Sequence, residues 1–267
     1  AVVHPGYGGF GIDDAIICFN FRADRMRQIT SLFAKQHSDM PLLTMMSYKD
    51  DIPAQVLFPT EAIANHLIEV FENNNRVHHH ISESEKYAHV TYFFNGRREK
   101  AYPHEKRMHI KSYNDIATHD LRPVMRAPEI AQAIVEVVQS HKKEFIVANF
   151  ANADIVGHSG RVEPTIAACE AIDHALSVVI PHAQNMGWTT IVTADHGNAE
   201  MLVDPETGGP HTAHTLNPVP FILVPSIKNY YRLAAAEGSL ADIAPTILKL
   251  VELEKPEEMS GKSLIVH

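Results

Sequence analysis

The sequence predicts an α/β fold, in which a mostly parallel β-sheet carries helices on both faces. Short apolar runs typical of buried strands alternate along the chain with longer segments of helical periodicity. The chain has 267 residues, of which 45% are hydrophobic and 21% charged, as is ordinary for a globular protein. This length suffices for one large domain, or for one domain plus part of another.

Charge and cysteine content exclude several classes of protein. A formal net charge of −9 argues against non-specific binding to nucleic acid, which requires a basic face. No apolar run reaches transmembrane length and the N-terminus lacks the pattern of a signal peptide, so we expect a cytoplasmic protein with no membrane partner. The two cysteines, Cys18 and Cys169, form no CxxC pair and fit reduced thiols.

The first 73 residues predict strands alternating with helices. Residues 1–15 have the character of a loop that enters a strand, which suggests a chain that begins partway through a longer protein. The predicted elements are a strand at 15–21, a helix at 24–35, a strand at 42–47, a short apolar run at 54–59 and a helix at 60–73.

Beyond residue 73 the alternation continues around one irregular stretch. Residues 87–94 predict a strand that ends at an Asn-Gly turn signal. Residues 97–126 are rich in charge and predict irregular structure. The run His78-His79-His80 lies beside a strand-like stretch, where neighbours face opposite ways, so we assign it no metal. The remaining predicted elements are helices at 127–140, 163–183 and 240–251 and strands at 144–150, 189–193 and 221–224.

Residues that commonly bind metals follow two of these strands. In open parallel sheets, ligands bind outside the carboxyl ends of the strands. Asp154 and His158 come after the strand at 144–150 and are four residues apart, which in a helical turn allows both to reach one ion. Asp195 and His196 come after the next predicted strand. Adjacent residues there usually point apart, so they suit two ions or a sharp turn, which Gly197 would permit.

A third group, His211 and His214, precedes the strand at 221–224, and by position either histidine could complete a site. One ion bound by Asp154, His158 and His214, with a second bound by Asp195 and His196, would have mixed oxygen and nitrogen ligands. Such a set suits manganese or zinc better than calcium. Two ions about 4 Å apart could hold a phosphoryl group from both sides. The alternative for each pair is a histidine hydrogen-bonded to a carboxylate without metal.

Two arginines, Arg22 and Arg25, lie three apart where a strand ends and a helix begins. They would share one face near a helix N-terminus, which favours a phosphate or carboxylate ligand. The alternative is a solvated cluster of charges with Asp24. Lys86, beside Glu85, has a similar alternative as a surface charge.

Several ordered motifs resemble those of cofactor-independent phosphoglycerate mutase, across nearly the whole chain. They are Phe-Asn-Phe-Arg-Ala-Asp-Arg, Glu-Lys-Tyr-Ala-His-Val-Thr-Tyr-Phe-Phe-Asn-Gly, Asn-Ala-Asp-Ile-Val-Gly-His, Thr-Ala-Asp-His-Gly-Asn-Ala-Glu, Thr-Ala-His-Thr-Leu-Asn-Pro-Val-Pro, and the ending Leu240-Ala-Asp-Ile-Ala-Pro with Met259-Ser-Gly-Lys-Ser-Leu264. The resemblance implies an alkaline-phosphatase-like domain at 61–267, preceded at 1–60 by the remainder of an inserted α/β transferase domain.

The resemblance also implies a ligand set and a reaction. Asp154, His158 and His214 match the ligands of one ion, and Asp195 and His196 match ligands of the other; His211 lies outside the pattern. The ions are expected to be Mn²⁺, with Zn²⁺, Co²⁺ and Mg²⁺ as alternatives. Arg22 and Arg25 match arginines that hold the substrate, and Lys86 matches a catalytic lysine that contacts the phosphoryl group. The implied reaction interconverts 3-phosphoglycerate and 2-phosphoglycerate, a step of glycolysis and gluconeogenesis, through a phosphoserine.

The sequence departs from the family in its length, because members are roughly twice as long. Their N-terminal part supplies the nucleophilic serine and a further Asp ligand, so we expect this chain to need that part as a partner and to be inactive alone. Ser159, beside His158, is not expected to replace that serine. The competing hypotheses are another metal-dependent phosphatase, sulfatase or phosphomutase of the same superfamily, and a non-catalytic metal-binding fragment.

Overall fold

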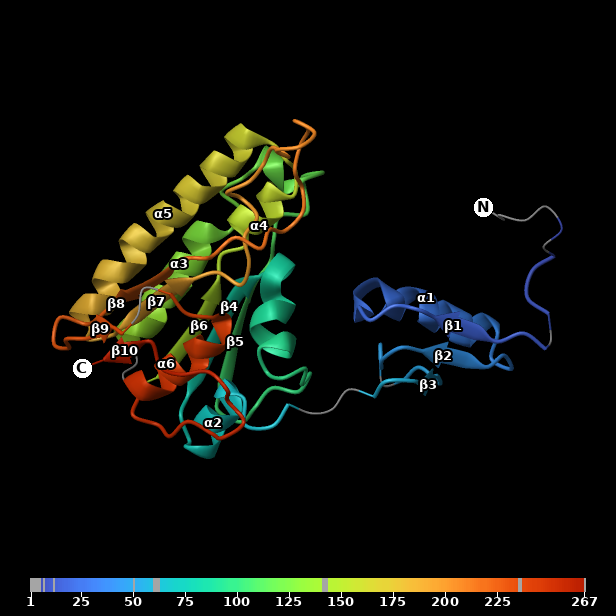
Figure 1. Cartoon of the computed structure of the whole chain (residues 1–267), viewed down its shortest axis with the longest axis horizontal. Helices are drawn as coiled ribbons and strands as arrows, with labels where there is room; N and C mark the ends of the chain where they lie inside the picture. The colour runs from blue at the N-terminus through green and yellow to red at the C-terminus, as the bar shows by residue number, and fades with distance from the viewer. Residues whose placement is uncertain are drawn as a thin grey trace. The chain divides into compact units, whose positions relative to one another are not determined.

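The computed structural model describes residues 6, 8–11, 13–49, 51–59, 63–140, 144–234 and 237–266, and for residues 23–25 it describes the backbone alone. The chain divides into two compact units, Ala1–Ala62 and Ile63–His267 (Figure 1). Among the described residues, no helix is long and apolar enough to cross a membrane. Whether the first unit is the remainder of a transferase domain stays a prediction.

The first unit is a small parallel sheet with one crossover helix. Strands β1 (Ile16–Cys18), β2 (Leu42–Thr44) and β3 (Gln55–Val56) pair in that order, and helix α1 (Ala23–Gln36) connects β1 to β2. Both predicted strands are confirmed but are shorter than expected. Beyond β1, the side chains of Phe19 and Phe21 are exposed, so the apolar run extends past the buried part of the strand.

The second unit is built on a three-stranded parallel sheet in the order β5-β4-β6. Strand β4 (His78–Glu83) is the central strand and is buried along its whole length, between β5 (Glu105–Ile110) and β6 (Phe145–Asn149). The register places Ile81 opposite Met108 on one side and Ala148 on the other. The three side chains therefore lie on the same face of the sheet.

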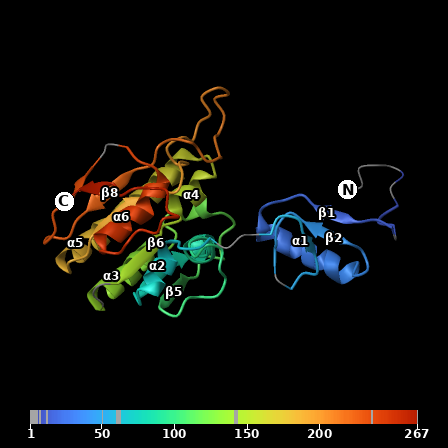
Figure 2. The same ribbon diagram turned by 60° about the horizontal axis from the view of Figure 1, so that its bottom comes forward.

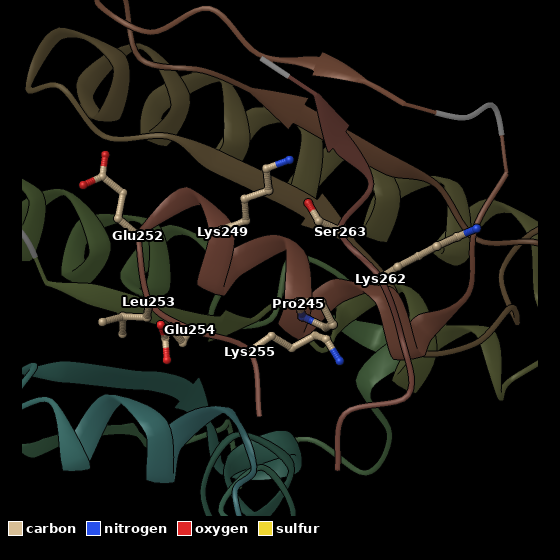
Figure 3. Close-up of a pocket in the computed structure, with 8 residues that line it drawn as sticks. All are labelled: Pro245, Lys249, Glu252, Leu253, Glu254, Lys255, Lys262 and Ser263. Atoms are coloured by element: carbon tan, nitrogen blue, oxygen red, sulfur yellow. The ribbon is translucent and has the colours of Figure 1, made fainter. Parts of the chain in front are cut away.

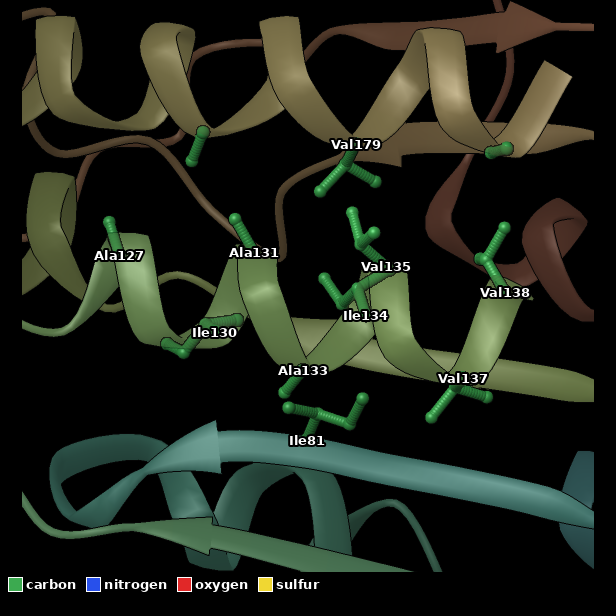
Figure 4. Close-up of a cluster of buried hydrophobic side chains, with 12 residues drawn as sticks. Ile81, Ala127, Ile130, Ala131, Ala133, Ile134, Val135, Val137, Val138 and Val179 are labelled. Carbon is green, nitrogen blue, oxygen red and sulfur yellow. The ribbon is translucent and has the colours of Figure 1, made fainter. Parts of the chain in front are cut away.

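Helix α3 (Ala127–Ser140) packs on this face, and helix α5 (Val162–Asn185) packs on α3 (Figure 4). Ile81 of the central strand meets the buried side of α3, and Val179 of α5 packs on the outer side of α3. The helix predicted at 127–140 is confirmed with the same ends. Its apolar residues recur at helical spacing and all belong to one core, which explains why the periodicity was informative.

The opposite face of the sheet is covered by α2 (Leu67–Asn73) and α6 (Ile243–Leu250), whose apolar residues form a second core (Figure 2). Phe145 of β6 points to this side, where its ring stacks on that of Phe71 at a centroid distance of 4.9 Å. Helices lie on both faces, as predicted, so we look for a ligand site at the carboxyl ends of these strands.

The other strand pairs in the described part of the chain are antiparallel, whereas the β1-β2-β3 and β5-β4-β6 sheets are parallel as expected. Strand β7 (Thr190–Thr193) pairs with β8 (Phe221–Val224), and the short β9 (Arg232–Leu233) pairs with β10 (Ile265–Val266). A parallel connection requires a crossover, usually a helix. Between β7 and β8 the chain forms a long loop without a helix, so it can return antiparallel.

The strand predicted at 87–94 is wrong, because these residues are helical. The chain leaves β4 through the 3-10 turn η1 (Ser84–Lys86) and continues into the π-helical turn η2 (His89–Phe93). Aromatic and β-branched composition favours a strand, but both edges of β4 are already paired with β5 and β6. Over so short a connection, a strand that directly followed β4 could pair with it only as a hairpin. Neither edge of β4 is free for such a hairpin.

Other boundaries also differ from prediction. The stretch at 97–126, predicted to be irregular, contains the whole of β5. This edge strand has several charged side chains, so its sequence lacks the apolar alternation by which a strand is predicted. The three histidines at 78–80 belong to β4 itself rather than lying beside a strand. The helix predicted from residue 60 begins at Leu67, and residues 60–62 lie outside the described part of the chain. The last predicted helix is divided into the 3-10 turn η4 (Leu240–Asp242) and α6.

Candidate metal centre

Asp154 is placed by the short helix α4 (Asn152–Gly157), which begins just beyond the carboxyl end of β6. Asp154 lies in its first turn, and His158 follows one turn later at the C-cap. The side chains therefore share a face, as the four-residue spacing predicts. Gly157, between them, leaves room for the buried side chain of Asn198, because a Cβ at this position would stand 2.6 Å from the Asn198 Oδ1 atom.

His214 joins this pair from the loop before β8, so that three ligand-type atoms converge. The Asp154 Oδ1 atom lies 3.3 Å from His158 Nε2 and 3.2 Å from His214 Nε2. The two imidazole nitrogens lie 3.1 Å from each other. Among the described residues, this is the one group of three or more carboxylate, imidazole or thiol donors that is arranged to hold a metal ion.

The hydrogen bonding of His158 explains why a cation suits this group. Its Nδ1 atom lies 2.7 Å from the carbonyl oxygen of Thr212, which can only accept, so Nδ1 carries a proton. In the neutral ring, the lone pair of Nε2 then faces Asp154 and His214. A cation at this point, a proton or a metal ion, would stabilise the carboxylate and the imidazole nitrogen that face each other.

The spacing of the donors also fits a first-row divalent ion. With bonds of about 2.1 Å, neighbouring ligand atoms stand about 3.0 Å apart in octahedral and about 3.4 Å apart in tetrahedral coordination. The three separations, from 3.1 to 3.3 Å, lie within this interval. One carboxylate and two imidazoles are ligands shared by manganese, zinc and cobalt, so the set does not select among them.

The Asp154 carboxylate is held by two further groups. Its second oxygen, Oδ2, forms an ion pair with the ammonium of Lys86, and Oδ1 accepts a hydrogen bond from Asn198 Nδ2 at 2.8 Å. Burial opposes ionisation of Asp154, but the hydrogen bonds from Lys86 and Asn198 outweigh it and lower the pKa to about 2. Asp154 is therefore ionised at neutral pH, as a metal ligand requires.

Lys86 is a buried lysine, only 7% exposed, at the end of η1. The sequence allowed it to be a surface charge, but the structure places its ammonium on the candidate metal ligand Asp154. The turn from β4 into η2 brings this about, because it directs residues 84–86 across the carboxyl end of the sheet. The structure therefore brings Lys86 to a candidate metal ligand, while its predicted contact with a phosphoryl group and its catalytic role stay predictions.

Asp195 and His196 lie beyond β7 but form a looser pair. The Asp195 Oδ2 atom is 3.5 Å from His196 Nε2, and the Asp195 side chain is 62% exposed. The imidazole of His196 stacks on that of His214, with ring centroids 3.6 Å apart, so the second group adjoins the first. The side chains do not point apart, as residues on a regular strand would, because the strand ends at Thr193 and the chain turns.

The other predicted residues have different surroundings. His211 is outside the cluster, and its Nδ1 atom lies 3.0 Å from the carbonyl oxygen of Met201. Arg22 is at the N-cap of α1 in the first unit and is exposed, and the side chain of Arg25 lies outside the described part of the structure. Their role toward a substrate therefore stays a prediction.

Two residues next to the cluster were given no role by the sequence. Asn198 hydrogen-bonds Asp154, and Glu200 hydrogen-bonds Thr215, the neighbour of His214. Both belong to the Asp-His-Gly-Asn-Ala-Glu segment. The available signal was their position directly after two candidate ligands, but a spacing of two or four residues does not indicate which distant segment they bind.

A separate cavity lies elsewhere in the second unit. It has a volume of about 460 Å³ and borders α6 and the C-terminal segment (Figure 3). Two of its lysines are already engaged: Lys249 donates to the carbonyl oxygen of Ile265 at 2.9 Å, and Lys255 donates to that of Met259. None of the candidate metal ligands lines this cavity, so we place the chemistry at the exposed donor cluster.

Comparisons with known proteins agree with a metal centre. The family model of the metalloenzyme superfamily matches residues 28–255, and that of the N-terminus of BPG-independent phosphoglycerate mutase (PGAM) matches residues 5–50. The 2,3-bisphosphoglycerate-independent phosphoglycerate mutase of Chloroflexus aggregans is 42% identical over 95% of this chain and 53% of its own length. That of Rhodopseudomonas palustris is 44% identical over 97% and 53%.

A solved structure is also similar: Leishmania mexicana phosphoglycerate mutase at low cobalt concentration matches with a TM-score of 0.84 and 28% identity, over 95% of this chain and 50% of that one. The chain belongs to the metalloenzyme superfamily. Within it, the similar proteins are 2,3-bisphosphoglycerate-independent phosphoglycerate mutases, which confirms the resemblance seen in the motifs. The chain spans about half the length of the curated relatives it matches.

Proposed function

We propose that this chain is the C-terminal, metal-binding part of a phosphoglycerate mutase that interconverts 3-phosphoglycerate and 2-phosphoglycerate, an isomerase of glycolysis and gluconeogenesis. The observation that carries the proposal is the convergence of Asp154, His158 and His214, with Lys86 paired to the same carboxylate. The second unit would be the alkaline-phosphatase-like domain, and the first the remainder of the transferase domain.

In this proposal the chain holds two divalent ions, with Mn²⁺ as the expected metal. Asp154, His158 and His214 would bind one, and Asp195 and His196 would contribute to the other. The ions would supply electrophilic stabilisation of the phosphoryl oxygens and activation of a hydroxyl nucleophile. The nucleophilic serine and a further Asp ligand would come from the N-terminal part of the enzyme, with which this chain would associate.

The chain's own residues would orient and neutralise the substrate. The Lys86 ammonium lies against a candidate metal ligand, so a phosphoryl group at the centre would come within its reach and be stabilised as charge develops. Arg22 and Arg25, at the start of α1, would hold the phosphoglycerate carboxylate or phosphate. Binding by these arginines would keep the glycerate in place between the two phosphoryl transfers.

Two unpaired strand edges support an N-terminal partner. Among the described residues, β6 pairs with β4 alone and β7 with β8 alone, although both are apolar strands of the kind found inside sheets. Ile146 of β6 and Trp188, just before β7, pack on the same core of α3 and α5. A strand from the partner could pair with either edge and reach the donor cluster at its carboxyl end.

The test is complementation. The chain, loaded with Mn²⁺, is mixed with the N-terminal half of the R. palustris relative, and 3-phosphoglycerate is followed by ³¹P NMR after quenching with EDTA. We expect 2-phosphoglycerate to form only when both halves and metal are present, and not with Asp154→Asn. Release of inorganic phosphate alone would favour a hydrolase of the same superfamily. A folded, metal-loaded pair that does neither would favour a metal-binding fragment without catalysis.

A further inference from the structure

The candidate ligands come from three segments that are far apart in the sequence. Asp154 is on α4, His196 follows β7, and His214 lies in the loop before β8. Metal binding requires the donor atoms to be held within a few tenths of an ångström, and loops alone do not provide this. The contacts that join the three segments therefore matter as much as the ligands.

Asn198 joins the first segment to the second. The residue is 4% exposed, and its Nδ2 atom donates to Asp154 twice, to Oδ1 at 2.8 Å and to the main-chain oxygen at 3.2 Å. Both the carboxylate and the backbone that carries it are thereby fixed. The close approach of Asn198 to Gly157 leaves the amide little freedom to rotate away.

Glu200 joins the second segment to the third. Its Oε2 atom accepts the main-chain N–H of Asn198 at 2.7 Å. Its Oε1 atom accepts the hydroxyl of Thr215 and, at 2.9 Å, the amide of Asn217. The Thr215 main-chain N–H also donates to the Gly197 oxygen at 2.9 Å, in an isolated antiparallel bridge. One carboxylate thus connects the residue after His214 to the residue that holds Asp154.

The charge of Glu200 suits this position. Several hydrogen bonds lower the pKa of Glu200 to about 2, and the bond from the Thr215 hydroxyl has the largest effect. Desolvation raises the pKa, but by less. Glu200 is therefore an ionised acceptor for three donors at neutral pH, and hydrogen bonds to an ionised acceptor are about twice as strong as neutral ones. None of these three partners is a candidate metal ligand, so Glu200 would act on an ion through the segments that it joins rather than as a ligand.

We propose that Glu200 is a positioning residue of the metal centre, which fixes the loop of His214 against the segment of His196 and, through Asn198, against Asp154. This inference rests on the proposed metal centre but not on the proposed reaction. Removing the carboxylate leaves the three ligands in place and loosens their mutual geometry. We therefore expect weaker metal binding and an altered coordination geometry, with the fold retained.

Binding of Co²⁺ to the purified chain measures both effects, because its visible absorption reports coordination geometry as well as occupancy. For Glu200→Gln, which keeps the size of the side chain but loses an acceptor, we expect Co²⁺ affinity to fall by roughly 10- to 100-fold. The absorption band should shift as well. Glu206→Gln, the matched control at an exposed position on the same loop, should bind within about 2-fold of wild type.

A double-mutant cycle with Thr215→Val tests the route of the effect. If Glu200 acts through Thr215, the losses in Co²⁺ affinity for the two single variants will not add in the double variant. Fluorescence of Trp188, the single tryptophan, checks that the second unit is folded. Should Glu200→Gln not fold, Asn217→Ala and Thr215→Val each remove one donor, and either must weaken Co²⁺ binding for the inference to hold.

The outcomes distinguish this inference from the metal centre itself. Wild-type affinity and an unchanged spectrum in a folded Glu200→Gln would overturn the positioning role while leaving the metal centre intact. A wild-type chain that binds no Co²⁺ would instead overturn the metal centre. Loss of affinity with additive effects in the cycle would exclude the route through Thr215.

Discussion

The second unit contains two groups of histidines that behave differently. His78 and His80 are fully buried in β4. His80 Nδ1 donates to the Val90 carbonyl, its Nε2 lies 2.7 Å from His78 Nδ1, and His78 Nε2 lies 2.9 Å from Glu72. Each ring nitrogen of this pair has a partner within the protein. In the cluster of His158 and His214, by contrast, the Nε2 atoms face each other and one carboxylate.

The difference lies in where the second nitrogen of each ring points. In β4, the ring nitrogens of His78 and His80 all lie within hydrogen-bond distance of partners in the core, so these two histidines stabilise packing. At the end of the sheet, one nitrogen of His158 is fixed by a carbonyl, and the other converges with His214 Nε2 on the Asp154 carboxylate. A sequence rich in histidine therefore does not by itself locate a metal site.

The largest effect should come from removing the shared carboxylate. We expect Asp154→Asn to weaken Mn²⁺ binding by about 1,000-fold, or about 4 kcal/mol. The substitution removes the charged ligand that the imidazoles of His158 and His214 both face. His80→Gln should bind within about 3-fold of wild type, since His80 belongs to the buried pair. Isothermal titration calorimetry on the purified chain measures both constants.

Asp154→Asn also leaves the buried ammonium of Lys86 without its counter-ion, which could impair folding. The double variant Asp154→Asn, Lys86→Met removes this charge and separates the two effects. It should recover stability without recovering Mn²⁺ binding. Equal Mn²⁺ affinity for folded Asp154→Asn and wild type would show that the carboxylate is not a ligand.

The next largest effect concerns the buried pair and pH. Burial, assisted by His78 and Arg107, lowers the pKa of His80 to about 4 from its ordinary 6.5. The unfolded chain therefore takes up a proton at higher pH than the folded one, and stability falls as pH decreases from about 6.5 toward 4. Between pH 7.5 and 5.0, His80 accounts for about 2 kcal/mol of this loss, and His80→Gln should abolish that part.

Urea unfolding followed by Trp188 fluorescence in EDTA measures this change for the second unit. His182→Gln is the control, because His182 is exposed on α5. The control should keep the full pH dependence of wild type. If His80→Gln and wild type lose the same stability between the two pH values, the buried histidine is not the group that titrates.

The sequence predicted those parts of the molecule in which local pattern and tertiary environment agree. The helix at 127–140 matches its predicted ends, because its apolar residues are buried as expected. The strand at 221–224 also matches its predicted ends, although Ile222 is 50% exposed. Strand β4 was not predicted over His78–Glu83, since a buried strand made of histidine, serine and glutamate has no apolar signal. The polar residues that make this strand difficult to predict are also the ones whose buried contacts stabilise it.

For the metal centre, the sequence predicted the donors but not their supports. The spacing of Asp154 and His158 encodes one helical turn, so their proximity could be inferred. The contacts of Asn198 and Glu200 join segments separated by 15 to 44 residues, and no local pattern encodes such pairs. The burial of Lys86 could not be inferred either, because it depends on the turn that leaves β4.

The smallest effect should come from the second pair of ligands. Asp195 is mostly exposed and, among the described residues, has His196 as its ion-pair partner, whereas Asp154 has two imidazoles, Lys86 and Asn198 around it. An ion held by two protein ligands, one of them largely exposed to solvent, binds weakly. In the chain alone we therefore expect one tight Mn²⁺ and less than about 3-fold change in its affinity for Asp195→Asn, or below about 0.7 kcal/mol.

With an N-terminal partner present, the same substitution should remove one of two bound ions, which metal analysis by mass spectrometry would detect. Two tight ions in the isolated wild-type chain would contradict this, because the second group would then be complete without the partner.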